Sequence, residues 1–196
     1  MEKINLPQVT LVAMTGKDYE AHQRALDLSS EGVEFGDVKL IRRPDLKTID
    51  DWNRAIVFEL GDYVDTEFAL LVHADGYVIN PEAWRDEFLD YDYTGAPWPL
   101  PSDNFSYRDI NGQIQRVGNS VSLRSKKLMS LPSDLNIPWK SYYGNTNEDG
   151  FICVHNRHIF EANGCKFAPL EIAKYFSKEH EIPENVGISA FAFHSL

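Results

Sequence analysis

Cysteine is scarce in this sequence, which carries two cysteines, Cys153 and Cys165, among its 196 residues. Two such widely spaced thiols exclude a disulfide framework and a cysteine-built zinc site, and they indicate buried thiols in a reducing compartment. Long apolar runs are also missing, since no stretch approaches the roughly 18 apolar residues of a membrane span. The opening residues, MEKINLP, lack the basic flank and apolar run of a secretory signal. The sequence therefore predicts a cytoplasmic protein without a transmembrane segment.

Positive charge is the second shortage. The chain has 19 lysines and arginines against 30 aspartates and glutamates, a formal net charge of -11 at pH 7. Such a surface repels nucleic acid and anionic membranes, so we expect no nucleic-acid partner. It also disfavours an anionic ligand, which would have to be held locally by a cation, helix N-termini or a few arginines. This requirement favours a metal ion.

The length and the 43% of hydrophobic residues predict a single domain over residues 1–196. Alternating strand and helix patterns predict an α/β fold with a mixed, mostly parallel sheet flanked by helices. We expect strands at 9–14, 35–41, 67–76, 117–123 and 166–169. We expect helices at 19–29, 49–60, 82–89, 125–129, 148–163 and 170–177, with a mobile loop over 99–116 and another loop over 132–147.

Polar residues follow the predicted strand over 67–76. His73 and Asp75 are two residues apart, so in an extended chain they point the same way, and a carboxylate there can bind a hard divalent cation. The isolated His194, in an apolar tail, could complete a metal site with Asp75. The alternatives are an ordinary Asp-Gly turn after a strand and a buried or merely terminal histidine.

Two acids open the predicted helix over 148–163. Glu148 and Asp149 follow a loop, where a carboxylate can project into a cleft and act as a general base toward a hydroxyl. Their alternative role is to stabilise the helix N-terminus.

Two arginines are candidates for binding an anion. Arg124 ends a strand that begins with small residues, and Arg54 lies on the predicted helix over 49–60. Either guanidinium could pair with a phosphate, although an exposed structural arginine is the commoner case at such positions.

Taken in order, five segments of the sequence resemble the GT-A class of nucleotide-sugar glycosyltransferases, and most closely an uncharacterised glycosyltransferase-like domain family. The segments are LLVHADG at 70–76, DEFLDYDYTGAPW at 86–98, VGNSVSLRS at 117–125, ED at 148–149 and FH at 193–194. The resemblance covers nearly the whole chain, and YDYTGAPW is its specific part. It implies a GT-A-like fold and transfer of a hexose from a nucleotide-diphosphate donor to a glycan or other hydroxyl acceptor.

The resemblance also implies roles for single residues. Asp75 matches the surviving acid of the metal-binding DxD motif, His194 matches a late metal-ligand histidine, and Asp149, beside Glu148, matches the catalytic base. The cofactor would be Mn²⁺ or Mg²⁺. Further residues are implied on the donor side, namely Thr15, Arg54, His73, Gly76 and Arg124, and on the acceptor side, namely Trp98, Gly118 and Asn119.

The sequence departs from the family pattern at two places. His73 replaces the first acid of DxD, which weakens the expectation of metal dependence, and Ser120-Val121 replaces the commoner pair of glycines. A catalytically silent module that binds a carbohydrate or nucleotide sugar is therefore an alternative. A metal-dependent phosphohydrolase using His73 and Asp75 is a third, although such enzymes usually have more acid and histidine ligands.

Overall fold

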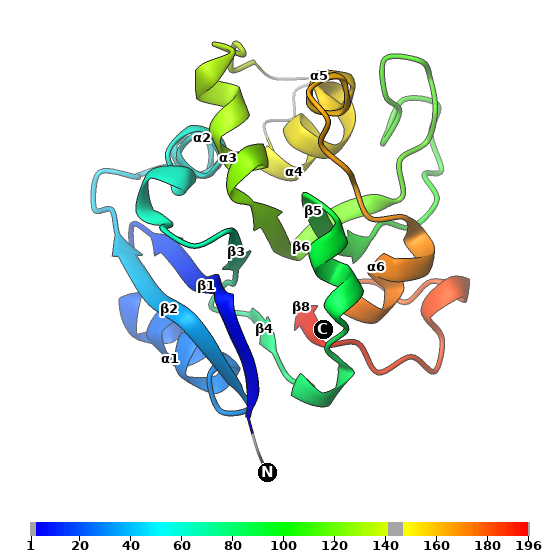
Figure 1. The fold of residues 1–196 in the computed structure, drawn as a ribbon. Helices are drawn as coiled ribbons and strands as arrows, with labels where there is room; N and C mark the ends of the chain where they lie inside the picture. Colours follow the sequence, from blue (N-terminus) through cyan, green and yellow to red (C-terminus); the bar gives the residue numbers. More distant parts are fainter. Residues whose placement is uncertain (1–2, 141–146, 196) are drawn as a thin grey trace.

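A five-stranded sheet forms the centre of the molecule in the computed structural model, which describes residues 3–140 and 147–195 (Figure 1). The strand order is β2-β1-β3-β6-β5. Its strands are β1 (Ile4–Thr15), β2 (Val33–Arg42), β3 (Phe68–Leu71), β5 (Tyr93–Pro97) and β6 (Val117–Ser125).

The sheet changes direction at one place. Strands β2, β1 and β3 are parallel, whereas β6 is antiparallel to both of its neighbours, β3 and β5. Four of the five strands therefore run the same way, which agrees with the predicted mixed, mostly parallel sheet. The carboxyl ends of β1, β2 and β3 meet the first residues of β6 at one edge, and such a reversal point is where open α/β sheets bind ligands.

A second sheet has the order β4-β8-β7 and consists of β4 (Gly76–Val78), β7 (Ser177–Lys178) and β8 (Ala192–His194). Strand β8 is antiparallel to β4 and parallel to β7. This pairing places the residues just after β3 beside residues more than a hundred positions later in the chain.

Helices cover both faces of the larger sheet. They are α1 (Tyr19–Ser29), α2 (Ile49–Phe58), α3 (Lys126–Asp134), α4 (Glu148–Gly150), α5 (Arg157–Ala162) and α6 (Leu170–Phe176). In β1, Leu11 and Ala13 belong to the core that includes Leu26 of α1, whereas Val12 and Met14 belong to the core beneath α2 and α3. Because successive strand residues point to opposite faces, a strand covered on both sides is apolar throughout.

The N-terminus of α2 has a capping box formed by Thr48 and Asp51. The backbone N of Asp51 donates to Thr48 Oγ1 at 3.1 Å, and the backbone N of Thr48 donates to Asp51 Oδ2 at 2.8 Å. This reciprocal pair fixes the start of α2 at Ile49.

The region predicted as one helix over 148–163 is broken. A π-helical segment, Phe151–His155, separates α4 from α5. Both the backbone N and the side-chain Nδ2 of Asn156 donate to the carbonyl of Phe151, at 3.1 and 3.0 Å. The backbone bond joins the N–H of residue i+5 to the carbonyl of residue i, as in a π-helix, in place of the i+4 to i bond of an α-helix. Asn156 follows the last residue of the π-helical segment.

Three other predicted elements differ from the structure. The strand over 67–76 ends at Leu71, the helix over 82–89 is two 3-10 helices, Pro81–Ala83 and Asp86–Asp90, and the strand over 166–169 is a single bridge from Phe167 to Tyr93. Two more 3-10 helices lie at Leu60–Tyr63 and Pro183–Asn185. The loop expected over 132–147 lies partly outside the described residues, and α3 extends into its start.

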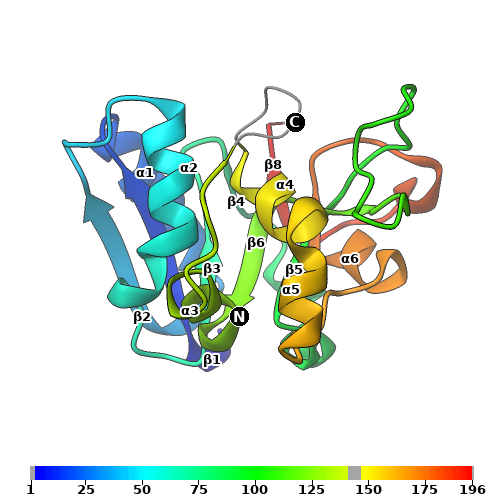
Figure 2. The ribbon, with the colours of Figure 1, turned by 90° about the horizontal axis from the view of Figure 1, so that it is seen from above.

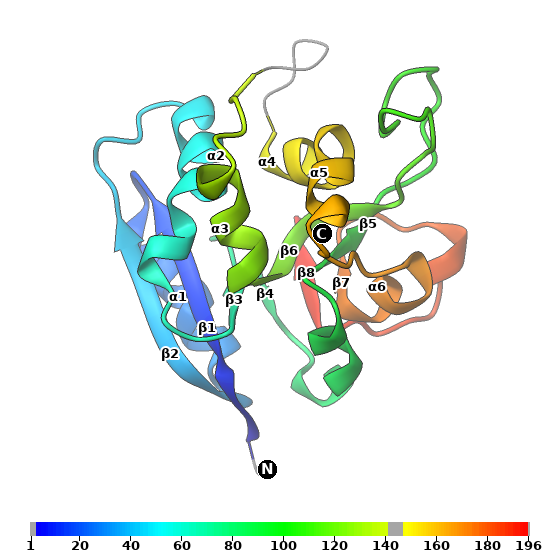
Figure 3. The same ribbon diagram turned by 45° about the horizontal axis from the view of Figure 1, so that its top comes forward.

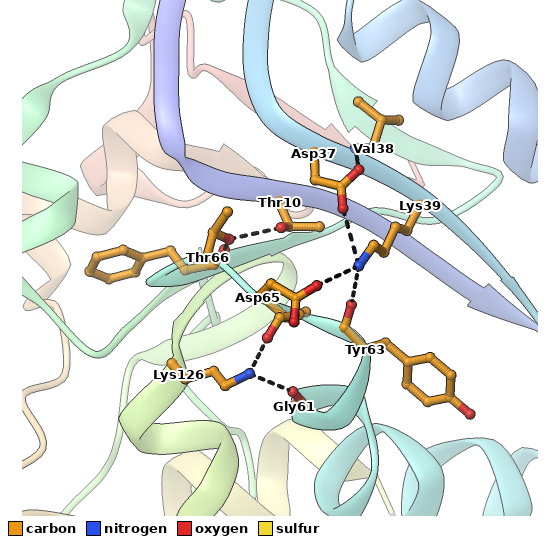
Figure 4. A network of polar contacts seen from close by, with 11 residues as sticks. Thr10, Asp37, Val38, Lys39, Gly61, Tyr63, Asp65, Thr66 and Lys126 are labelled. Atoms are coloured by element: carbon orange, nitrogen blue, oxygen red, sulfur yellow. Dashed lines mark hydrogen bonds and ion pairs between the residues drawn. The ribbon is translucent and has the colours of Figure 1, made fainter.

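Two lysines, Lys39 and Lys126, bind the segment that connects α2 to β3 (Figure 4). This segment lies at the edge of the sheet opposite the carboxyl ends of β1, β2 and β3. Lys39 Nζ lies 3.1 Å from Asp37 Oδ2 and 3.2 Å from Asp65 Oδ2. Lys126 Nζ donates to the carbonyl of Gly61 at 3.0 Å. Both ammonium groups therefore stabilise this connection.

Among residues 3–140 and 147–195, no helix is long and apolar enough to cross a bilayer.

Candidate active site

A cavity of about 960 Å³ opens at the carboxyl ends of β1 and β3. It brings together seven of the residues singled out in the sequence, namely Thr15, His73, Asp75, Asn119, Glu148, Asp149 and His194. Figures 2 and 3 show α4 beside β6 in the middle of the molecule, with α2 on one side and α6 on the other. The volume falls within the roughly 300–1,000 Å³ of small-molecule sites.

One end of this cavity is cationic. Lys17, just after β1, and Lys47, just before α2, line it beside Thr15. In the described part of the chain neither ammonium group makes an ion pair, although the chain as a whole is strongly acidic. Thr15 Oγ1 donates to the carbonyl of Lys17 at 2.6 Å. Sequence reasoning missed both lysines, because they lie in loops without any pattern.

Residues 73–76 form a tight turn rather than the extended segment that the sequence predicted. The backbone N of His73 donates to the Gly76 carbonyl at 2.8 Å, and the backbone N of Gly76 donates in return to the His73 carbonyl at 3.2 Å. His73 and Asp75 nevertheless line the same cavity, and both lie near His194, whose ring centroid is 5.0 Å from that of His73. The His73 ring lies against Trp52, with Nε2 3.0 Å from Ser120 Oγ.

The His73 imidazole is uncharged at neutral pH. Burial, followed by the nearby His194, lowers its pKa to about 3. His73 therefore lines the cavity as a neutral polar group, at the position where the DxD motif has its first acid.

Asp75 and His194 do come together, as the sequence predicted for a metal site. His194 Nε2 lies 3.4 Å from Asp75 Oδ1, and His194 Nδ1 lies 3.4 Å from Glu179 Oε1. Burial lowers the pKa of His194, but the two carboxylates outweigh it and raise the pKa above its ordinary value. For Asp75, burial acts to raise the pKa, and the hydrogen bond from Ser195 together with the His194 charge brings it below its ordinary value.

Gly76 supports this arrangement without lining the cavity. It pairs with His194 across β4 and β8, and a Cβ at this position would lie 2.6 Å from His194 Cδ2. The residue is therefore needed for close packing against the imidazole. Within residues 3–140 and 147–195, no group of three or more His, Cys, Asp and Glu side chains has the arrangement of a metal site. Asp75 and His194 are the pair that could hold a cation together with ligand oxygens.

Arg124 and Glu148 form a buried ion pair. Arg124 Nη2 lies 2.6 Å from Glu148 Oε2, and the two side chains are 1% and 5% exposed. Arg124 Nε also donates to Ser122 Oγ at 2.9 Å, and the Glu148 backbone N donates to Asn53 Oδ1 at 2.9 Å. The Arg124 guanidinium therefore binds Glu148 and Ser122 inside the protein. It does not line the cavity, where it was expected to bind a phosphate.

Arg54 is likewise not brought to the cavity. It lies one residue beyond the buried Asn53, on the exposed side of α2. The resemblance placed Arg54 on the donor side, whereas the α2 residues that line the cavity are Ile49, Trp52 and Asn53.

Asp149 is half-buried and lines both the larger cavity and a second, smaller one of about 270 Å³. Burial, followed by the negative charge of Glu148, raises the pKa of the Asp149 carboxyl to about 7. The hydrogen bond from the backbone N of Gly150, at 2.7 Å, opposes this shift. A carboxylate with such a pKa is suited to accept a proton at neutral pH.

The smaller cavity contains two of the residues that the resemblance assigned to the acceptor side. Trp98 and Asn119 line it, and Asn119 lines the larger cavity as well. Trp98 is stacked on Tyr107, with ring centroids 4.8 Å apart and planes at 15°. Gly118 packs behind Trp98 and lines neither cavity.

We expect Gly118→Ala to destabilise the protein, because the added methyl group would overlap the Trp98 indole. Overpacking of this kind costs about 1–3 kcal/mol, which urea unfolding can measure. Gly150→Ala is the control, since a Cβ there meets nothing closer than His155 Nε2 at 4.0 Å. An unchanged free energy of unfolding for Gly118→Ala would contradict the packing argument.

Comparison with known proteins gives a family and a fold. The family described as "Protein of unknown function (DUF5672)" matches residues 46–194, which include every predicted site residue except Thr15. No curated protein matches the chain in sequence.

Among solved structures, the chain is similar to a glycosyltransferase involved in the glycosylation of the major capsid of PBCV-1. The TM-score is 0.59 at 15% identity, over 95% of this chain and 92% of the other. The inositol-1-phosphate CTP transferase from T. maritima gives a TM-score of 0.36 at 14% identity, over 82% of this chain and 64% of the other. The first likeness confirms the GT-A-like, mixed α/β fold.

Proposed function

The chain belongs to the DUF5672 family, and from its site we propose that this member is a glycosyltransferase that moves a hexose from a nucleotide-diphosphate donor to a hydroxyl acceptor. The observation that carries the proposal is the position of Asp149, a carboxylate with a pKa near 7 that lines two adjoining cavities. A base placed between the two substrates can take the proton of an acceptor hydroxyl during transfer. The shared fold with a viral glycosyltransferase agrees with this proposal.

The donor would occupy the larger cavity. Lys17 and Lys47 offer positive charge to a diphosphate at one end, and Trp52 and the 69%-exposed Ile49 offer apolar surface to a nucleobase or a sugar face. These unpaired lysines locally oppose the acidic field of the chain.

Asp149 would take the proton from the acceptor hydroxyl as that oxygen attacks the anomeric carbon and the bond to the leaving diphosphate breaks. Glu148 cannot easily share this role, because its carboxylate is tied to the buried Arg124. Its negative charge instead helps to keep the Asp149 pKa near 7. Attack by an acceptor activated in this way agrees with inversion at the anomeric carbon.

A divalent cation, Mn²⁺ or Mg²⁺, fits beside Asp75 and His194. Their oxygen and nitrogen atoms lie 3.4 Å apart, and the Asp75 side chain is 66% exposed. Sites for these ions commonly use one or two protein ligands and complete their coordination with substrate phosphates and water. When bound, the ion supplies positive charge to the leaving diphosphate.

We expect one family of nucleotide sugars to stabilise the protein in the presence of manganese, and Asp75→Ala to abolish that effect. Ligand at about 100 times its Kd should raise the unfolding temperature by about 5 °C or more for a chain of this length. The panel contains UDP-, GDP-, CMP- and dTDP-sugars with and without manganese.

Asp62→Ala is the matched control, since Asp62 is exposed and lies in the 3-10 helix Leu60–Tyr63, away from the cavity. Stabilisation that needs neither manganese nor Asp75 would refute the cation site but keep the donor site. Stabilisation by no donor would refute the transferase, and saccharide binding without turnover would then indicate a silent binding module.

A further inference from the structure

Glu179, the residue that follows β7, is a carboxylate that the function proposed above does not use. Its side chain is 16% exposed, and its Oε1 lies 3.4 Å from His194 Nδ1. Its other oxygen, Oε2, is buried and has no hydrogen-bond partner among the described residues. No sequence pattern marked this residue.

A buried carboxylate oxygen without a donor is costly, because water has been removed and nothing has replaced it. An ionised carboxylate can only accept hydrogen bonds, so a donor group such as a ligand hydroxyl would satisfy this oxygen. Glu179 lines both cavities, as do Asn119, Asn147 and Asp149. A hydroxyl bound by Glu179 would therefore lie close to the proposed base.

The charges around the smaller cavity restrict what can enter it. Asp149 and Glu179 are its acidic groups, and none of the described residues that line it is a lysine or an arginine. His155 is uncharged at neutral pH because burial, followed by the charge of Lys140, lowers its pKa. The other histidine of the lining, His180, is exposed. A ligand carrying a carboxylate or phosphate would therefore meet two acidic side chains there, and no lysine or arginine among the described lining residues would contact it.

Aromatic side chains provide the other wall of this cavity. Phe105, which is 51% exposed, and Tyr107, which is stacked on Trp98, line it. Such faces pack well against the C–H groups of a sugar ring, while a carboxylate binds its hydroxyls.

We propose that the smaller cavity is the acceptor subsite, that it selects an uncharged sugar over an acidic one, and that Glu179 Oε2 accepts a hydrogen bond from an acceptor hydroxyl. The proposal rests on the transferase function argued above. Glu179 sets acceptor specificity in this scheme, whereas Asp149 removes the proton.

The test is saturation-transfer NMR with neutral methyl hexopyranosides and the matching methyl hexuronides, recorded with the nucleoside diphosphate that stabilises the protein. We expect the wild-type protein to bind a neutral glycoside at least about tenfold more tightly than its uronide, a difference typical of one hydrogen bond to a charged group.

Two variants separate the hydrogen bond from the charge. Glu179→Gln removes one of the two acidic groups, so the neutral glycoside should bind about tenfold more weakly and the preference over the uronide should become smaller. Glu179→Asp keeps the charge, but its shorter side chain moves the carboxylate oxygen away from the acceptor hydroxyl. Affinity for the neutral glycoside should therefore fall, while the preference over the uronide remains. Glu181→Gln is the control, since Glu181 is exposed, lines neither cavity and forms an ion pair with Lys178 at 3.4 Å.

Equal binding of neutral and acidic glycosides by the wild-type protein would overturn the proposal, as would binding of no neutral glycoside or unchanged binding by both Glu179 variants. Stabilisation by a donor nucleotide in the same samples shows whether the donor site is intact. Failure of the acceptor proposal is thereby distinguished from failure of the transferase function. A loss of sugar transfer by Glu179→Gln without any loss of glycoside affinity would identify Glu179 as a base instead.

Discussion

Replacing Asp149 with asparagine is expected to lower the rate of sugar transfer by about 10²–10⁴-fold, the usual contribution of general acid–base catalysis. The amide keeps the size of the side chain and an oxygen to accept the Gly150 hydrogen bond, but it cannot take a proton. Donor binding, measured by thermal shift, should be retained. Asp134→Asn, at the exposed end of α3, is the control and should transfer normally.

The pH dependence gives an independent test of the same residue. The base works only when deprotonated, so transfer by the wild-type protein should rise with pH and reach half its maximum near pH 7. Folding stability should move the other way. Between the unfolded pKa of about 3.9 and the folded value of about 7, the folded state binds more protons, so this group lowers stability as pH rises.

The amide side chain of the Asp149→Asn variant does not titrate, so the variant should gain stability relative to the wild-type protein as the pH is raised from about 4 to about 8. Urea unfolding at the two pH values measures this difference. Full transfer activity of Asp149→Asn would show that another group, with Glu179 the first candidate, is the base. A stability difference that does not change with pH would contradict the raised pKa.

The second large effect is expected at the buried ion pair. Arg124→Met should lower the free energy of unfolding by about 3–5 kcal/mol, because it leaves the Glu148 carboxylate buried without its partner. Arg124 also acts to lower the Asp149 pKa. Any folded Arg124→Met protein should therefore show its half-maximal activity at a higher pH than the wild-type protein.

A double variant separates the charge effect from loss of packing. Arg124→Met with Glu148→Leu should be much more stable than Arg124→Met alone, since no unpaired charge remains. Lys178→Met is the control for an exposed pair, where the loss should be at most about 1 kcal/mol. Equal losses at the buried and exposed pairs would contradict the role of burial. Equal losses in the single and double variants would point to packing of the arginine stem.

The elements that the sequence predicted best have strong local signals. Helix α1 has its predicted bounds. Helix α2 begins at Ile49, as predicted, because Thr48 and Asp51 form a cap between residues only three positions apart. The two-sided apolar pattern of β1 and β3 reflects helices on both faces of the sheet. Local chemistry decides such elements, so the sequence is sufficient for them.

The elements that the sequence did not predict depend on distant partners. Residues 73–76 were predicted to be the end of a strand, but they form a turn, after which Gly76 pairs with His194. Arg124 was expected to bind a phosphate or to be an exposed structural arginine, but its partner is the buried Glu148 of α4. Lys17 and Glu179 lie in loops, where no periodicity marks a residue that tertiary folding brings to a cavity.

The pairing of β4 with β8 also bears on how the protein is made. Asp75 and Ser195 are 120 positions apart in the chain, yet Ser195 Oγ donates to Asp75 Oδ2 at 2.9 Å, beside His194. A ribosome releases the N-terminal part first, so the turn at Asp75 leaves the exit tunnel long before its partners are translated. A nascent chain can build most of the larger sheet, but the contact between Asp75 and His194 forms only after β8 has been translated. A fragment that ends before β8 would therefore lack the strand partner of β4 and the contact between Asp75 and His194.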